Sequence, residues 1–202
     1  MPGKRPLSQR TSEYMPKIRT FIAVDTPPDV KYQIGMVRDQ LKSAGADVRW
    51  EPNEKLHCTL KFLGASDSVL LEKIIVALER EAGRTPPLSI RYRSIGCFPT
   101  IKDPRVVWIG MEEGGSGLAS LQQRIEECLA PFGFPREERA FHPHVTLGRV
   151  KGRHNIVNLL RMIESVTFES EPVTLREVLL VKSDLRPAGS VYTTLKSLPL
   201  TA

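Results

Sequence analysis

Two short stretches of the chain carry the same combination of reactive side chains. They are Leu56–Gly64 (LHCTLKFLG) and Phe141–Arg149 (FHPHVTLGR). Each contains His-x-Thr-Leu within a short apolar run, which is typical of a β-strand. Side chains two apart on a strand project from the same face, so His57 is expected beside Thr59 and His144 beside Thr146. The sequence therefore predicts two strands that each present an imidazole and a hydroxyl on one face and apolar side chains on the other.

These side chains suit chemistry on a phosphate group. Histidine titrates near pH ~6.5, so at neutral pH one imidazole of a pair can act as a general base and the other as a general acid. Displacement at phosphorus needs the attacking and leaving oxygens on opposite sides, which two opposed strands supply. A threonine hydroxyl beside each histidine can donate to a non-bridging oxygen. The carboxylates near the two stretches form no evident metal-ligand cluster, so the sequence predicts a site without a metal.

Residues near the two histidines are candidates for further substrate contacts. By alternation Lys61 shares the face of His57 and is expected either to reach the substrate or to stand in solvent. His142 falls on the face of His144, at the rim of the site, as a substrate contact or a bystander. Strict alternation places Arg149 on the apolar face, so only a β-bulge or the end of the strand would turn it toward the site.

Other polar and aromatic residues have weaker signals. Tyr92, together with Arg91 and Arg93, is expected either to form part of a nucleic-acid surface or to lie on a half-buried strand with a polar outer face. Trp50 and Trp108 are expected to be packing anchors. The remaining apolar residues of the first stretch, which are assigned to the core, are Leu56, Cys58, Leu60 and Phe62.

The elements that must position these residues follow from the hydrophobic periodicity. Strands are predicted at 18–24, 88–98, 106–109, 166–168, 174–181 and 191–195, in addition to the two His-x-Thr strands. Helices are predicted from Asp29 to about Gly45, from about 66–68 to Gly83, from about 118 to Gly133 and over 155–163. Each half has two helices, and the two His-x-Thr strands lie about half a chain apart. We therefore expect an α+β protein with an internal duplication and a pseudo-twofold axis.

Bulk composition limits the class of protein. The 202 residues correspond to one domain, or to two small lobes that share a core. The net charge of +6 favours a polyanionic partner such as nucleic acid. The three cysteines form no CxxC pair, and no apolar run is long enough to span a bilayer, so we expect a cytoplasmic protein with no membrane partner. Residues 1–17 are basic and contain three prolines, so they are expected to form a flexible tail before a single domain over 18–202.

The chain also resembles a known family. Beyond the two His-x-Thr stretches, the resemblance includes Phe98-Pro99, Arg105–Trp108, and Lys182–Leu185 with Gly189 and Tyr192. With these features, residues 18–198 resemble the two-histidine phosphoesterases, and most closely the RNA 2',3'-cyclic phosphodiesterases once named 2'-5' RNA ligases. The resemblance implies a bilobal fold, two pseudo-twofold-related lobes of antiparallel sheet with outer helices, around a central cleft.

The resemblance also implies an activity. It is the opening of a 2',3'-cyclic phosphate on RNA or a nucleotide to a 2'-phosphate, without a metal or another cofactor, by a monomer. His57 is then the acid that protonates the leaving O3' and His144 the base that activates water, although the roles could be reversed. Thr59 and Thr146 would hold the phosphate oxygens, and the reverse reaction would join RNA ends through a 2'-5' linkage.

Three other functions remain open at this stage. One is a cyclic phosphodiesterase for small nucleotides, such as an ADP-ribose cyclic phosphate. Another is a nucleotide-binding module without catalysis. The last is a metal site built from His142, His144, His154 and Cys58. Alternation argues against it, because it places Cys58 on the face opposite to His57.

Overall fold

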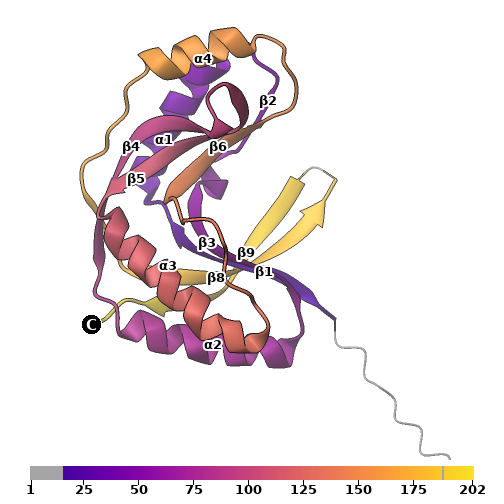
Figure 1. The fold of residues 1–202 in the computed structure, drawn as a ribbon, viewed down its shortest axis with the longest axis vertical. Helices are drawn as coiled ribbons and strands as arrows, with labels where there is room; N and C mark the ends of the chain where they lie inside the picture. The colour runs from indigo at the N-terminus through magenta and orange to yellow at the C-terminus, as the bar shows by residue number, and fades with distance from the viewer. Residues whose placement is uncertain (1–15, 188) are drawn as a thin grey trace, which may run out of the picture.

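The computed structural model describes residues 16–187 and 189–202, and its ribbon is shown in Figure 1. The predicted tail lies outside the described residues except for Pro16 and Lys17. The strands are β1 (Ile18–Asp25), β2 (Val48–Trp50), β3 (His57–Ser66), β4 (Leu88–Thr100), β5 (Asp103–Glu113), β6 (His144–Val150), β7 (Val173–Leu175), β8 (Glu177–Arg186) and β9 (Gly189–Pro199). The α-helices are α1 (Pro28–Lys42), α2 (Ser68–Gly83), α3 (Gly115–Leu129) and α4 (Ile156–Ser165), and short 3₁₀ helices lie at Asn53–Lys55 and Ala130–Phe132.

The strands form two antiparallel sheets. Sheet A has the order β3-β1-β8-β9, and sheet B has the order β2-β6-β5-β4-β7. Apart from the short β2, the two orders correspond strand by strand, with β3 of sheet A equivalent to β6 of sheet B. Cα atoms of β3 and β6 approach within 8 Å, so the two His-x-Thr strands lie where the sheets meet. The predicted α+β fold with two related lobes is confirmed.

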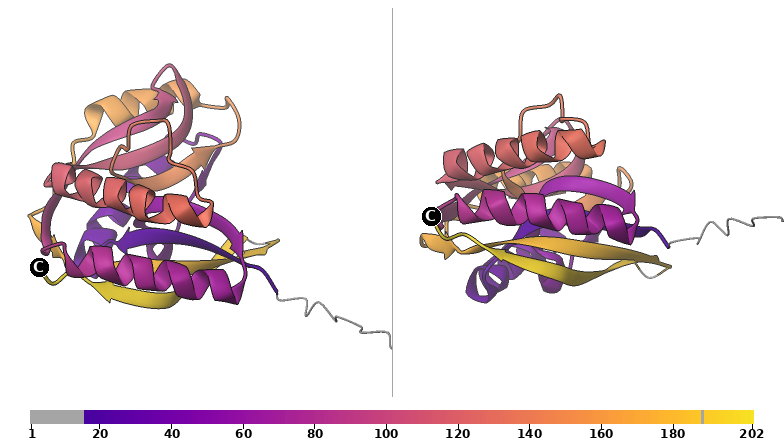
Figure 2. Two further views of the ribbon diagram at one scale, coloured as in Figure 1. Left: turned by 60° about the horizontal axis from the view of Figure 1, so that its bottom comes forward. Right: turned by 90° about the horizontal axis from the view of Figure 1, so that it is seen from below.

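The helices join the two lobes into one body. Helices α2 and α3 lie side by side on sheet A, and α1 packs with α4 at the opposite end of the molecule (Figures 1 and 2). Helix α1 follows a strand of sheet A and α3 follows a strand of sheet B, so each lobe contains one helix from each half of the chain. One continuous cluster of buried apolar side chains therefore runs through both lobes. None of the helices within residues 16–187 and 189–202 is long and apolar enough to cross a bilayer.

Local sequence signals account for most of the elements. The stripe of α1 consists of Val30, Ile34, Val37 and Leu41, and all four are buried. Helix α2 begins at an N-cap, since the carboxylate of Asp67 accepts a hydrogen bond from the backbone N–H of Leu70 at 2.8 Å. The apolar β5 is the middle strand of sheet B, as its sequence predicts.

One of the predicted strands is wrong, and another is divided in two. Residues 166–168 form no strand, and only the adjacent Glu169 makes an isolated bridge to Arg93. The predicted strand at 174–181 is two strands, β7 and β8, because the chain leaves one sheet and enters the other between Leu175 and Glu177. Periodicity detects the extended backbone here but not the change of sheet.

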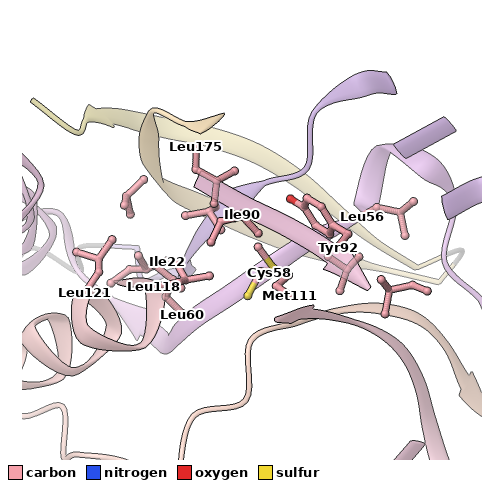
Figure 3. Packing of buried hydrophobic residues seen from close by; sticks show 14 of the residues in the cluster. Ile22, Leu56, Cys58, Leu60, Ile90, Tyr92, Met111, Leu118, Leu121 and Leu175 are labelled. Atoms are coloured by element: carbon pink, nitrogen blue, oxygen red, sulfur yellow. The ribbon is translucent and has the colours of Figure 1, made fainter. Parts of the chain in front are cut away.

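The core contains one residue that the sequence offered as a substrate contact. Tyr92 is fully buried and lies among Ile90, Cys58 and Met111 in Figure 3, so it cannot touch a ligand. The reason is the position of β4 between β5 and β7, which turns one face of the strand into the core. Cys58 is buried as predicted.

Candidate active site

The structure brings both histidines and both threonines to the junction of the sheets. His57, Thr59, His144 and Thr146 are all half-buried, whereas the residues between them, Cys58 and Val145, are fully buried. The Cys58 thiol lies against the backbone of His144, and the charge of a protonated His144 acts on His57. The repeat in the sequence therefore corresponds to a single site with an imidazole and a hydroxyl from each lobe.

Each imidazole is oriented by a carbonyl two residues earlier in the chain. Nδ1 of His144 donates to the carbonyl of His142 at 2.7 Å. A ring N–H of His57 donates likewise to the carbonyl of Lys55. A carbonyl can only accept, so each ring has one nitrogen fixed as a donor, and in the neutral form its other nitrogen is an acceptor. Both rings are thus arranged to take up or release a proton at the nitrogen that is not bound to the backbone.

Burial determines the charge of the pair. Burial lowers the pKa of His57 to about 4, an effect that the backbone hydrogen bond to Lys55 and the nearby Asp25 carboxylate oppose. Burial also lowers the pKa of His144, and the charges of His142 and Arg149 act in the same direction. Both shifts favour the neutral imidazole at pH 7 in the free protein. An anion between them would favour the protonated forms and raise both pKa values.

Aromatic rings support each imidazole. Phe21 stacks on His57 with ring centroids 5.0 Å apart, and Tyr192 meets the same imidazole edge-on at 5.4 Å. On the other side Phe98 contacts His144 edge-on at 4.9 Å, and the ring of Trp108 lies 6.4 Å away. Both imidazoles are therefore fixed in orientation by contacts with rings as well as by backbone hydrogen bonds.

A pocket of about 140 Å³ adjoins His57. Most of its lining residues belong to β1, β8 and β9 of sheet A. Its lining residues are Phe21, Ala23, Asp25, Glu54, His57, Leu179, Val181, Tyr192 and Thr194. Phe21, Ala23 and Val181 form a small apolar cluster separate from the main core.

A β-bulge occurs at the same place in both His-x-Thr strands. In β3 the pairing with β1 skips Leu60, and in β6 the pairing with β5 skips Leu147. Each skipped residue is the third after its histidine. An extra residue reverses the alternation of the following side chains. Beyond each bulge, the residues that face the site are therefore not those that strict alternation predicts.

The bulge in β3 makes the predictions for Lys61 and Phe62 wrong. Lys61 is 4% exposed and forms a buried ion pair with Glu126, so it does not reach the substrate. Phe62, which was expected in the core, is 62% exposed and lies on the site face with its ring 6.0 Å from that of Phe21.

The bulge in β6 turns Arg149 toward the site. Arg149 is exposed, and its charge lowers the pKa of His144, which places the guanidinium near that imidazole. His142 lies at the rim, exposed, with its ring 4.7 Å from that of Trp108. Arg149 and His142 are therefore both able to contact a ligand.

Comparison with known proteins identifies the family. The family model of the 2'-5' RNA ligase superfamily matches residues 26–187. The chain belongs to the 2'-5' RNA ligase superfamily. It is 36% identical over 178 residues to the RNA 2',3'-cyclic phosphodiesterase of Methanothermobacter thermautotrophicus, covering 88% of this chain and 96% of that protein. It is 30% identical over 184 residues to the protein of the same name from Aquifex aeolicus, covering 89% and 95% respectively.

Solved structures show the same fold. Escherichia coli LigT in complex with 3'-AMP has a TM-score of 0.71 and 27% identity, covering 92% of this chain and 99% of LigT. The protein TT0787 of Thermus thermophilus has a TM-score of 0.69 and 26% identity, with 91% and 98% covered. This chain therefore has the same bilobal fold as LigT and TT0787, as the sequence resemblance implies.

The sequence did not predict that several aromatic residues lie at the site. Trp108 was expected to be a packing anchor, but its half-buried ring lies against Phe98 and His142 at the site. Phe21 and Phe62 were assigned no role beside His57. The strand that carries Trp108 has two apolar faces, so alternation does not indicate which of them faces the site.

The metal-site alternative is not supported by the geometry. Cys58 points into the core, and burial raises the pKa of its thiol to about 12, so it remains protonated at neutral pH. Across residues 16–187 and 189–202, no three His, Cys, Asp or Glu side chains group as metal ligands. The proposed ligands His142, His144, His154 and Cys58 do not form such a group.

Proposed function

We propose that this protein hydrolyses 2',3'-cyclic phosphate ends of RNA to 2'-phosphates. The observation that carries the proposal is the pair of imidazoles at the junction of the sheets, each tied by one nitrogen to the backbone. The curated relatives are RNA 2',3'-cyclic phosphodiesterases, and LigT has been crystallised with 3'-AMP, with ATP and with phosphate. The positive net charge suits an RNA substrate.

In the proposed step His144 removes a proton from water while the water oxygen attacks phosphorus. The bond from phosphorus to O3' breaks, and O3' takes the electron pair together with a proton from His57. The products are a 2'-phosphate and a free 3'-hydroxyl. Solvent then removes the proton from His144 and returns one to His57. No metal ion or redox cofactor takes part in this sequence.

Other site residues bind the phosphate. Thr59 and Thr146 donate their hydroxyls to the non-bridging oxygens, one from each lobe, and stabilise the charge that builds up as the bond to O3' breaks. Arg149 adds a positive charge on the side of His144. Because the phosphate raises the pKa of both imidazoles, it favours the protonated His57 that the step requires.

The same site also catalyses ligation under this proposal, with a different nucleophile in the same displacement. A 5'-hydroxyl in place of water would attack the cyclic phosphate and form a 2'-5' linkage. Water is present at about 55 M, so hydrolysis dominates unless binding holds the second RNA end at a comparable effective concentration.

Product analysis tests the proposal. An oligoribonucleotide ending in a 2',3'-cyclic phosphate is incubated with the protein in the presence of EDTA, and the product is identified by phosphorus NMR. A 2'-phosphate is expected, at a rate that EDTA does not change. A 3'-phosphate would contradict the assignment of the leaving oxygen, and binding without turnover would indicate a nucleotide-binding module.

Variants test the assigned roles. His57→Ala and His144→Ala should each lower kcat/KM by about 10³-fold or more, in line with the loss of a general acid or base. His154→Ala, an exposed histidine that contacts Asn155, is the control and should retain full activity. With an aryl phosphodiester, whose leaving group needs no proton, His57→Ala should lose less activity than His144→Ala. The opposite order would reverse the acid and base assignments.

A further inference from the structure

Two arginines of neighbouring strands face each other beside the site. Arg49 of β2 pairs directly with Arg149 of β6 across the antiparallel ladder, so both side chains lie on the same face. This is the face of His144, because the bulge at Leu147 turns Arg149 to that side. Both arginines are exposed. Like charges directly opposed on two strands are destabilising unless an anion lies between or beside them.

A third cation, Lys55, comes close to Arg49 from the 3₁₀ helix between β2 and β3. A Cβ atom built on Gly189 would lie 3.5 Å from Nζ of Lys55 and 4.0 Å from an Nη atom of Arg49. Nζ of Lys55 also lies 5.8 Å from the ring centroid of Tyr192. Gly189 has a φ of +124°, which side-chain-bearing residues rarely adopt, so this position both permits the backbone turn and leaves the space between the cations open.

The three cations have no acidic partners among the residues that the structure describes. None of Arg49, Lys55 and Arg149 forms an ion pair there. Other cations of the sheets do, since Arg91 and Arg93 bind Glu169 and Lys182 binds Asp184. A group of neighbouring cations that form no ion pair is suited to bind a phosphate.

We propose that Arg49 and Lys55 form a second phosphate subsite, which binds the phosphodiester on the 5' side of the nucleotide that carries the cyclic phosphate. Arg149 pairs with Arg49 on the ladder, and its charge acts on the imidazole of His144. The inference rests on the proposed function, and it narrows the substrate to chains of at least two nucleotides. A mononucleotide 2',3'-cyclic phosphate fills only the site between the histidines.

Rates with matched substrates test the subsite. The probes are adenosine 2',3'-cyclic phosphate, the same nucleotide with a 5'-phosphate, and the dinucleotide ApA ending in a 2',3'-cyclic phosphate. The dinucleotide should have a kcat/KM about tenfold or more above that of the plain mononucleotide, mainly through a lower KM. A 5'-phosphorylated mononucleotide that matches the dinucleotide would assign the subsite to any second phosphate, small nucleotides included, and would overturn the restriction to RNA chains.

Variants separate the subsite from general charge. Arg49→Gln and Lys55→Gln should each lower the ratio of dinucleotide to mononucleotide kcat/KM about fivefold to tenfold. Each should also reduce the salt dependence of the dinucleotide reaction, by about 0.7 in the slope of log(kcat/KM) against log[salt]. Exposed cations on the outer helices serve as controls, and Lys73→Gln and Arg161→Gln should leave the ratio unchanged.

The outcomes distinguish the two proposals. Hydrolysis of the plain mononucleotide and the dinucleotide at equal kcat/KM would overturn the subsite and leave the proposed function intact. If neither substrate is hydrolysed, the proposed function fails, and the subsite is then tested by binding. Calorimetry should still show tighter binding of ApA ending in a 2'-phosphate than of 2'-AMP, with a difference that Arg49→Gln removes. Equal affinities would overturn the subsite.

Discussion

Beneath the site, a buried ion pair joins the strand of one histidine to the segment that leads to the other. Lys61 of β3 and Glu126 of α3 are 4% and 5% exposed, and their side chains are in direct contact. Nζ of Lys61 also donates to the carbonyl of Pro135 at 2.9 Å, and the backbone N–H of Glu137 donates to Glu126 at 3.3 Å. Both contacts fix the segment between α3 and β6 that carries His142.

Removing one partner should strongly destabilise the protein. Lys61→Met leaves Glu126 as a buried carboxylate whose remaining donors, among the residues that the structure describes, are Gln122 and one backbone N–H. A buried charge that has lost its partner costs about 3–5 kcal/mol, so Lys61→Met and Glu126→Gln should each lower the free energy of unfolding by about that amount. The double variant buries no unpaired charge, and its loss should be smaller than the sum of the single losses by about 2 kcal/mol or more.

Urea unfolding followed by circular dichroism measures these values. The control is Lys42→Met, which removes an exposed partner of Asp39 with the two side chains 44% and 56% exposed, and which should cost less than about 1 kcal/mol. A loss in the double variant equal to the sum of the two single losses would contradict a stabilising ion pair. So would single losses no larger than that of the control. In the folded single variants kcat should also fall, because the segment that orients His144 is loosened.

Further predictions concern charge at the site. The pKa of His57 is about 4 in the folded protein and near ~6.5 when unfolded, so only the unfolded state gains a proton as pH falls through this range. The titration of His57 should therefore lower the free energy of unfolding by at most about 2 kcal/mol between pH 7.5 and 5. Urea unfolding of His57→Gln at the same pH values should lack this decrease. The protein should take up protons when it binds inorganic phosphate, because the charge of the phosphate raises the pKa of both imidazoles. Calorimetry measures this uptake as a difference in binding enthalpy between two buffers of different ionisation enthalpy, and equal enthalpies would contradict it. Arg149→Gln should lower kcat/KM by about tenfold to a hundredfold, with partial recovery in Arg149→Lys, and equal loss in both variants would contradict a charge effect.

The sequence predicts most of the elements and the positions of the two catalytic candidates. A period of two places His57 beside Thr59, and a helical period places the stripe of α1, because both patterns depend only on neighbouring residues. The duplication indicates that the two His-x-Thr strands meet. These features require no knowledge of which strands pair.

What the sequence could not predict depends on pairing between distant strands. The bulges at Leu60 and Leu147 exist only relative to β1 and β5, so strict alternation places Lys61, Phe62 and Arg149 on the wrong faces. The burial of Tyr92 likewise depends on the strands beside β4. Periodicity within a segment contains no information on any of these contacts.

The bulges also explain how a duplicated scaffold can hold an asymmetric substrate. In both strands the fifth residue after the histidine is turned toward the site, and it is Phe62 in one lobe and Arg149 in the other. The backbone and the His-Thr pairs are related by the pseudo-twofold axis, so by themselves they treat the two ester oxygens of a cyclic phosphate alike. An exposed apolar ring on one side and a guanidinium on the other remove that equivalence. We therefore expect the direction in which the ring of the substrate opens to depend on these two side chains more than on the histidines.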